Sequence, residues 1–268
     1  MPKIPLTNAL RTEYESLFNA CDIRPERARE IDNTVTSLVA SQPRYAAVEA
    51  GCGVPWHVVA VIHNMEASRK FTTHLHNGDP LSARTMHVPA GRPREGAPPF
   101  AWEASALDAL RLRRLGPAVD WSLAGTLYQI EGYNGWGYRS FHPHVKSPYL
   151  WCFSLHYVSG KYVSDGTWSE TAVSKQCGAA VLLRRMAEKQ IIEFVDQPLP
   201  PGGDSPLVVP YSMKKSRNPA LVARAEDLQR WLNTFPGVFV KVDGTPGQKT
   251  SDAYRLVTGS HLPGDPRG

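Results

Sequence analysis

The spacing of apolar residues predicts a mainly helical chain. The run over residues 54–68 is the clearest case, because its apolar residues recur at i, i+3, i+4 and i+7 as on a buried helix face: Val58, Val61, Ile62 and Met65. Helices are also expected over residues 7–51 with a break at Pro25, over residues 102–114, and over residues 172–190. Another is expected from Trp121 onward, with Asp120 as its N-cap.

Two stretches lack this pattern. Residues 71–100 are rich in Pro, Gly, His and Thr, and the sequence NGDP at 77–80 is a turn signal, so short strands or an ordered loop are expected. Residues 138–168 are dense in aromatic side chains. We expect them to form an irregular surface dominated by loops.

The chain divides by composition near residue 200. Residues 197–220 are rich in Pro and Gly and indicate a linker between a main domain, 1–196, and a small C-terminal segment, 221–268. In that segment, helices are expected over residues 223–235 and 248–257, with a turn at 242–247. The expected fold class is α+β, mainly α, with a small helical C-terminal segment.

Composition restricts the class of protein. With 268 residues, of which 42% are hydrophobic, the chain can bury a full core. Its net charge of +5 is spread over scattered Lys and Arg, and the densest basic runs, at 111–114 and 214–217, are too short for a nucleic-acid-binding arm. A mild basic balance suits an anionic polymer partner, a class that includes nucleic acids, cell-wall glycans and membrane surfaces.

The N-terminal residues 1–18 lack the apolar core and cleavage pattern of a Sec signal, and no stretch approaches the roughly 20 apolar residues of a membrane span. We therefore expect synthesis and folding in the cytoplasm. The four cysteines are widely spaced, without a C-x-x-C pair. Buried free thiols are the favoured interpretation and disulfides the alternative.

Glu66 is the most informative residue for chemistry, because it adjoins the buried stripe of the helix over 54–68. Val59 and Ile62 precede it on the same side, which predicts partial desolvation and a raised pKa. A carboxylic acid of this kind can donate a proton near neutral pH. Cleavage of a glycosidic bond needs such a donor, and often a second carboxylate as base, nucleophile or charge stabiliser.

Two residues are candidates for the second carboxylate. Asp79 lies in a polar loop, where it should stay ionised, although an Asn-Gly-Asp-Pro sequence also uses its Asp to cap its own turn. Ser68, Thr85 and His87 accompany it as candidate binding residues. Glu131 is the other candidate, and its alternative role is that of a buried structural carboxylate.

Glu131 is followed by Tyr133 and Asn134, and then by glycines that would let a ligand approach the backbone. An aromatic ring and an amide in this place suit a sugar with an N-acetyl group, and the alternative is an ordinary helix C-cap.

The histidines suggest a metal site only weakly. His74 and His76 lie near Asp79, and His63 precedes Glu66 by one helical turn, but no standard zinc spacing is present. Nucleotide-binding glycine motifs and a G-x-S-x-G elbow are also missing. We therefore expect no metal and no cofactor, and nucleotide chemistry is disfavoured.

The helix sequence VPWHVVAVIHNMEASRKF and the later Tyr133-Asn134-Gly135 element together resemble the lysozyme-like superfamily of lytic transglycosylases and goose-type lysozymes. In that superfamily the catalytic Glu is commonly followed directly by Ser, whereas in this chain Ala67 intervenes before Ser68. The strings HLHNGDPLSARTMHVPAGRP, EGYNGWGY, SPYLW and GKYVSDG resemble a narrower phage and bacterial group of peptidoglycan hydrolases, over roughly residues 40–190. The tail is similar to peptidoglycan-binding modules, with a pattern carried by Leu228, Gln229, Leu232, Asn233, Asp243, Gly244, Gly247, Thr250 and Ala253.

This resemblance implies a lysozyme-like domain that cleaves the β-1,4 bond between N-acetylmuramic acid and N-acetylglucosamine, as a muramidase or a lytic transglycosylase. Glu66 would be the acid, with Asp79 or Glu131 assisting, and the binding residues would be Ser68, His63, Thr85, His87, Tyr133, Asn134, Tyr149 and Trp151. The expected partner is the peptidoglycan glycan strand, without nucleic acid or membrane, and the protein is expected to be a monomer that reaches the cell wall after release or export. The alternatives are a non-catalytic wall-binding protein, and a chitinase or chitosanase on the same type of fold.

Overall fold

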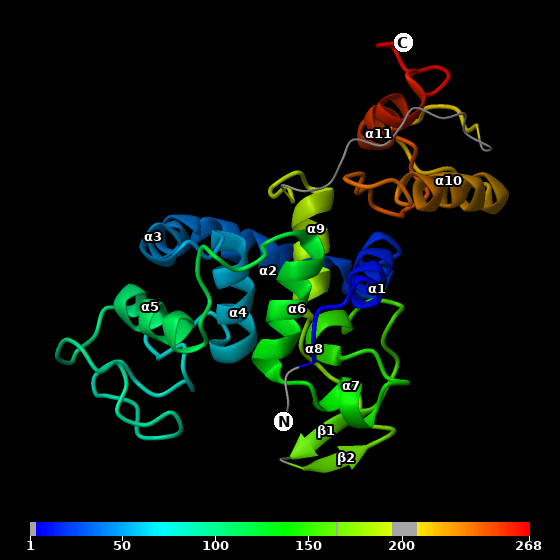
Figure 1. Ribbon diagram of the computed structural model, residues 1–268. Coiled ribbons are helices and arrows are strands. Elements are labelled where there is room, and N and C mark those ends of the chain that lie inside the picture. The colour runs from blue at the N-terminus through cyan, green and yellow to red at the C-terminus, as the bar shows by residue number, and fades with distance from the viewer. Residues whose placement is uncertain (1–3, 165, 195–207) are drawn as a thin grey trace.

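The computed structural model describes residues 4–164, 166–194 and 208–268 (Figure 1). Most of the regular structure is helical, and the sheet found among these residues has two antiparallel strands. The expectation of a mainly helical α+β chain is therefore confirmed.

Among the described residues, helices make up the main body, and one two-stranded hairpin interrupts them. In chain order the helices of the main body are α1 (Asn8–Asn19), the short 3₁₀ helix η1 (Pro25–Arg27), α2 (Ala28–Ala40), α3 (Gln42–Cys52), α4 (Trp56–Ala67), α5 (Trp102–Leu112), α6 (Leu123–Asn134), α7 (Gly137–Phe141), α8 (Pro148–Trp151) and α9 (Ala179–Glu188). The strands β1 (Lys161–Ser164) and β2 (Thr167–Ser169) lie between α8 and α9, and α10 (Pro219–Leu232) and α11 (Gln248–Thr258) complete the chain.

Helix α4 is the centre of the main core. It packs against α3, α6 and α9, and its residues from Val58 to Met65 are all buried. Gly53 ends α3 in the left-handed conformation, with φ of 69°, and Pro55 caps the start of α4. At the other end, Ser68 takes the left-handed conformation and ends the helix. Glu66 therefore lies in the last turn of a helix that is otherwise enclosed.

Two predicted helix starts are wrong. Helix α6 is capped by Ser122, whose hydroxyl accepts a hydrogen bond from the Gly125 amide at 3.0 Å, and Asp120 instead accepts from the Ser122 amide. Helix α9 begins at Ala179, seven residues later than expected. Gly178 before it lies against the Leu150 carbonyl, where a Cβ would approach to 2.2 Å. Residues 172–178 contain neither helix nor strand.

The two stretches without a helical pattern differ in outcome. Residues 71–100 form an ordered loop, with an isolated antiparallel bridge between Thr73 and Pro80. Residues 138–168 are more regular than expected, since they contain α7, α8, β1 and the start of β2. In Figure 1 the β1–β2 hairpin lies at the opposite end of the molecule from α10 and α11.

The C-terminal segment has its own small apolar core, formed by side chains from α10, α11 and the loops beside them: Val209, Leu228, Leu232, Val238, Val240, Ala253, Tyr254, Val257 and Leu262. The predicted linker falls in part on residues 197–207, which lie outside the described residues. Residues 208–218, which are described, contain neither helix nor strand.

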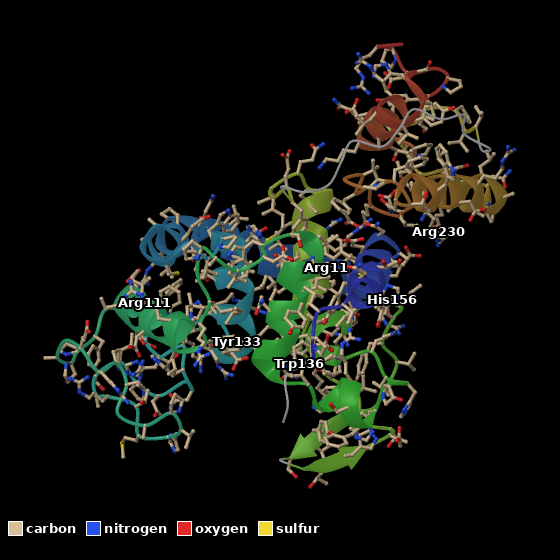
Figure 2. All side chains as sticks on the ribbon, in the orientation of Figure 1. Arg11, Arg111, Tyr133, Trp136, His156 and Arg230 are labelled. Atoms are coloured by element: carbon tan, nitrogen blue, oxygen red, sulfur yellow. The ribbon has the colours of Figure 1, made fainter. Side chains whose placement is uncertain are left out.

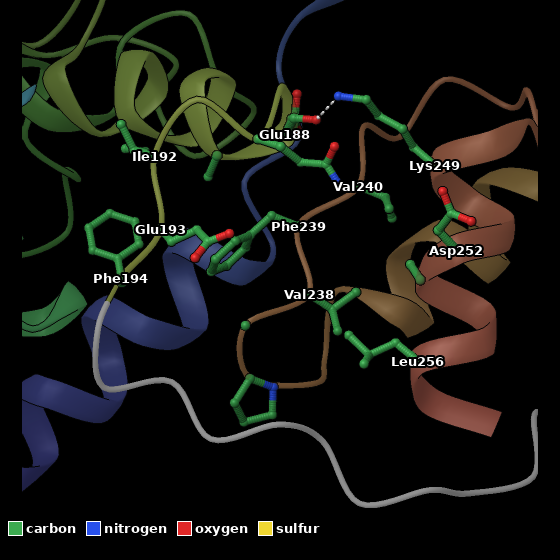
Figure 3. Close-up of a pocket in the computed structure, with 15 residues that line it drawn as sticks. Glu188, Ile192, Glu193, Phe194, Val238, Phe239, Val240, Lys249, Asp252 and Leu256 are labelled. Atoms are coloured by element: carbon green, nitrogen blue, oxygen red, sulfur yellow. Dashed lines mark hydrogen bonds between the residues drawn. The ribbon is translucent and has the colours of Figure 1, made fainter. Parts of the chain in front are cut away.

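The segment contacts the main body through a few specific groups. The Phe239 ring meets the Phe18 ring edge-on, with centroids 5.4 Å apart, and the buried Arg184 donates to the Val240 carbonyl at 3.0 Å. A cavity of about 430 Å³ lies beside these contacts (Figure 3). On its rim the Lys249 ammonium donates to the Glu188 carbonyl at 2.9 Å.

All four cysteines are free thiols, and Cys21, Cys152 and Cys177 are buried, which confirms the favoured interpretation. In the part of the chain that the structure describes, no single helix is long and apolar enough to cross a membrane. Helices α3 and α4 reach that length only as a pair, and the pair is bent by 113°.

Candidate functional site

Glu66 accepts a hydrogen bond from the Tyr149 hydroxyl at 2.6 Å. Glu66 is reached by solvent, yet protein groups crowd its carboxyl group and remove part of its hydration, which raises its pKa. The Tyr149 hydrogen bond and the positive charge of Arg113 act in the opposite direction but do not cancel this effect. The raised pKa expected for Glu66 is thus confirmed.

Two further side chains complete the surroundings of this carboxyl group. Tyr133 is buried at the end of α6 (Figure 2), and burial together with the charge of Glu66 raises the pKa of its hydroxyl. The Arg113 guanidinium lies 4.6 Å from the centroid of the Tyr133 ring. Burial and the Glu66 charge likewise hold the pKa of Tyr149 well above its usual value, so Tyr149 remains a proton donor to Glu66 at neutral pH.

A depression of about 560 Å³ adjoins this group. Tyr149 and Met65, the neighbour of Glu66, are part of its wall, together with residues from α6, α7 and the β1–β2 hairpin: Asn134, Tyr138, Phe141, Lys161 and Tyr162. The exposed Asn134 thus lies where the sequence placed it, beside the site. Aromatic rings with polar groups between them are suited to stacking on sugar rings and bonding their hydroxyls.

The contacts of Asp79 are those of a residue that holds its own loop, and not those of a second catalytic carboxylate beside Glu66. Its carboxylate accepts from the Met86 and His87 amides, at 2.7 and 3.0 Å, and from the His87 imidazole at 2.6 Å. These bonds, led by the His87 amide, hold its pKa well below the usual value. Asp79 is therefore ionised, as expected, but its oxygens are used to close the loop over residues 71–100.

Glu131 also makes structural contacts. Only 3% of its surface is exposed. It accepts a hydrogen bond from the Tyr14 hydroxyl and forms an ion pair with Arg139 at 2.7 Å. Of the two interpretations that the sequence left open, the contacts match the buried structural carboxylate.

The remaining predicted binding residues fall into two groups. Ser68 is exposed at the end of α4 and lines a second depression beside the first. Thr85 is buried in the loop, where its hydroxyl donates to the Pro89 carbonyl at 2.5 Å, and His87 belongs to the Asp79 contact. Trp151 is only 1% exposed, in the main core.

His63 is not placed at the site either. It is fully buried, 4.5 Å from the Trp102 ring by centroids, and its Nδ1 lies 3.1 Å from the Tyr45 hydroxyl. His63 does lie one helical turn before Glu66, as expected, but α3 and α5 cover the part of the α4 surface on which it lies.

The histidines near Asp79 have separate partners. His74 contacts the Ser105 hydroxyl at 2.6 Å, and His76 contacts Asp108 at 2.7 Å. Within the described ranges no group of three His, Cys, Asp or Glu side chains is arranged to hold a metal ion.

Sequence reasoning missed three residues at the site. Arg113 lies just past the end of α5, Lys161 begins β1, and the Gln176 amide donates to the Met65 carbonyl at 2.9 Å. Arg113 comes from a helix end, Lys161 from a segment without helical periodicity, and Gln176 from residues that were expected to be helical but are not. The only sequence signal for any of them is the basic run at 111–114, which does not distinguish Arg113 from its neighbours.

Comparison with known proteins finds no matching family model, no matching curated protein and no matching solved structure.

Proposed function

We propose that this protein cleaves the β-1,4 bond between N-acetylmuramic acid and N-acetylglucosamine in peptidoglycan, with Glu66 as the general acid. The observation that carries the proposal is the raised pKa of Glu66, whose hydrogen-bond partner Tyr149 lines an open depression together with other aromatic side chains. A carboxylic acid with a raised pKa holds its proton to higher pH and can give it to the glycosidic oxygen as an oxocarbenium-like centre forms. The resemblance of the α4 sequence to lysozyme-like proteins points to the same reaction.

In this mechanism the two oxygens of Glu66 have different tasks. Oε1 accepts the Tyr149 hydrogen bond, which fixes the orientation of the carboxyl group, and Oε2 is left to carry the proton toward the substrate. After proton transfer, the Tyr149 hydroxyl and the Arg113 charge stabilise the carboxylate.

The second step needs a nucleophile. Asp79 and Glu131 are both engaged in other contacts. This favours the route that requires no second carboxylate, in which the 6-hydroxyl of the N-acetylmuramic acid attacks C1 of the same sugar and gives its proton to the Glu66 carboxylate. An anhydro product forms, and Glu66 is protonated again. Attack by water, which gives a reducing end, is the alternative outcome of the same first step.

The test is lysis of purified cell walls by wild-type protein, Glu66→Gln and a matched control, Glu26→Gln, which changes an exposed carboxylate on η1 in the same way. We expect Glu66→Gln to lose about two orders of magnitude or more in rate, the usual contribution of general acid catalysis, while it still binds the wall. The control should lyse as wild type does. Full lysis by Glu66→Gln would exclude Glu66 as the acid, whereas wall binding without lysis by the wild-type protein would support the non-catalytic alternative.

A further inference from the structure

Two depressions meet at Met65, the residue before Glu66 in α4. The first is the aromatic one of about 560 Å³, and the second, of about 540 Å³, lies toward α2. Their walls share Met65, Lys161, Ser174 and Gln176. They therefore form one groove that passes over Met65 at the end of α4, and Lys161 lies at the junction. Tyr149, which donates to the proposed acid Glu66, is part of the wall of the first depression.

The two halves of the groove differ in chemistry. The first half is aromatic, with Phe141 63% exposed. The second half carries the positive charges of Arg69, Lys161 and Lys175, against the single carboxylate of Glu30 among its described lining residues.

These positive charges are not neutralised by other contacts in the described part of the chain. Arg69 donates to the neutral Asn64 side chain at 2.9 Å, and none of the ion pairs found there involves Arg69, Lys161 or Lys175. Glu30 is paired with Arg27 at 3.0 Å. A groove with unpaired cations attracts an anionic ligand and disfavours an uncharged one.

We propose that the second half of the groove binds carboxylates carried by the glycan strand, and that Arg69, Lys161 and Lys175 select an acidic strand over a neutral one such as chitin. This inference rests on the proposed function, because it names the substrate class of the same groove. The carboxylates have two possible sources: the acidic substituent on the sugar itself, and the peptide stem attached to it. Either source presents the same group to the lysines and the arginine.

Binding should be measured with Glu66→Gln protein, so that no strand is cleaved during the titration. Three soluble ligands separate the sources: glycan strands with peptide stems, the same strands after an amidase has removed the stems, and chitin oligomers of matched length. We expect the affinity to fall in that order, and to weaken as NaCl is added for the acidic strands only.

The charge contribution is tested by Lys161→Gln and Lys175→Gln in the same background. Each should weaken binding of the stem-bearing strands by about three- to fivefold, the effect of a partly exposed ionic contact, and leave chitin binding unchanged. Lys214→Gln removes the same charge from an exposed site within residues 208–218, before the C-terminal segment, and should have no effect. Thermal unfolding of each variant should match that of the parent, whereas lysines that serve only to stabilise the end of α4 would lower the melting temperature.

Equal affinity for the three ligands would overturn the inference, as would tighter binding of a single-stranded oligonucleotide than of stem-bearing strands. Either result leaves the proposed function intact if wild-type protein still cleaves the wall and Glu66→Gln does not. If neither protein cleaves any strand but the salt-dependent preference is observed, the proposed function fails and the acidic-strand groove remains.

Discussion

Removing the Arg139 guanidinium should destabilise the fold far more than removing the carboxylate of its partly exposed partner Glu13. Glu131 is 3% exposed and depends on Arg139 and Tyr14 for its contacts. Taking away one partner of a buried ion pair costs about 3–5 kcal/mol, since the other charge is left without compensation. Tyr14 remains and Arg139 is 18% exposed, so we expect Arg139→Gln to lie near the lower end, at about 3 kcal/mol.

The matched control is Glu13→Gln. Glu13 pairs with the same arginine at 3.2 Å, but its side chain is 33% exposed, and the expected cost is below about 1 kcal/mol. Glu131→Gln should also destabilise, because it leaves an amide where Tyr14 and Arg139 both donate. In a chain of this size, about 3 kcal/mol corresponds to a melting temperature lower by roughly 6–12 °C.

Urea unfolding gives these free energies directly, and wall lysis measured well below the transition separates stability from chemistry. We predict that Glu131→Gln is less stable and still lytic when folded. The assignment of Glu131 to structure is refuted if Glu131→Gln unfolds like wild type and fails to lyse the wall.

Three further outcomes are expected. Because the rate depends on protonated Glu66, kcat/KM should fall as pH rises through the raised pKa of Glu66. Tyr149→Phe removes a hydrogen bond that lowers this pKa, so the fall in kcat/KM should occur at higher pH. A shift to lower pH in the pH–rate profile would contradict the assignment of Glu66 as the acid. In a thiol titration without reductant, the half-buried Cys52 should react in the native protein and the other three thiols only after unfolding, whereas fewer than four reactive thiols in denaturant would reveal a disulfide. The hydrogen bond from Arg185 holds the pKa of Asp32 at about 2, so this ion pair stabilises the fold above pH 3.8, and its contribution is lost as pH falls to about 2. Asp32→Asn should remove about 1 kcal/mol of that acid-dependent stability, allowing for the 32% exposure of Asp32. An unchanged pH dependence in urea unfolding would count against this role.

Local patterns were enough to predict the helix that carries the proposed acid. The apolar spacing in α4 placed Glu66 at the edge of a buried stripe, and its raised pKa follows from that position. The turn at Asn77-Gly78-Asp79-Pro80 was also recognisable locally. Its alternative interpretation, that Asp79 holds its own loop, is the one that the hydrogen bonds match.

The residues that contact Glu66 could be predicted less well from the sequence. Tyr149 lies on the four-residue helix α8, 83 positions further along the chain, where no periodic pattern exists. The sequence assigned it to substrate binding, but its contact with Glu66 depends on how α8 packs against α6 and α9. His63 was predicted to lie at the site because it is close to Glu66 along α4. Trp102 from α5 covers it, so that closeness in sequence did not place it at the site.

The start of α9 shows why helix ends were less predictable than helix interiors. The apolar spacing between Ala179 and Met186 is helical, as expected. The preceding segment is irregular and makes tertiary contacts instead, with the Gln176 side chain on the end of α4 and Gly178 against Leu150. Such contacts between distant segments leave no periodic signal in the sequence.

The most direct test of the proposed chemistry is mass spectrometry of the fragments released from purified peptidoglycan by wild-type protein and by Glu66→Gln at equal concentration. We predict that wild-type protein releases fragments cut between N-acetylmuramic acid and N-acetylglucosamine, with anhydro ends, and that Glu66→Gln releases almost none. Release of the same fragments by Glu66→Gln, or cuts only in the peptide stems, would contradict the proposal.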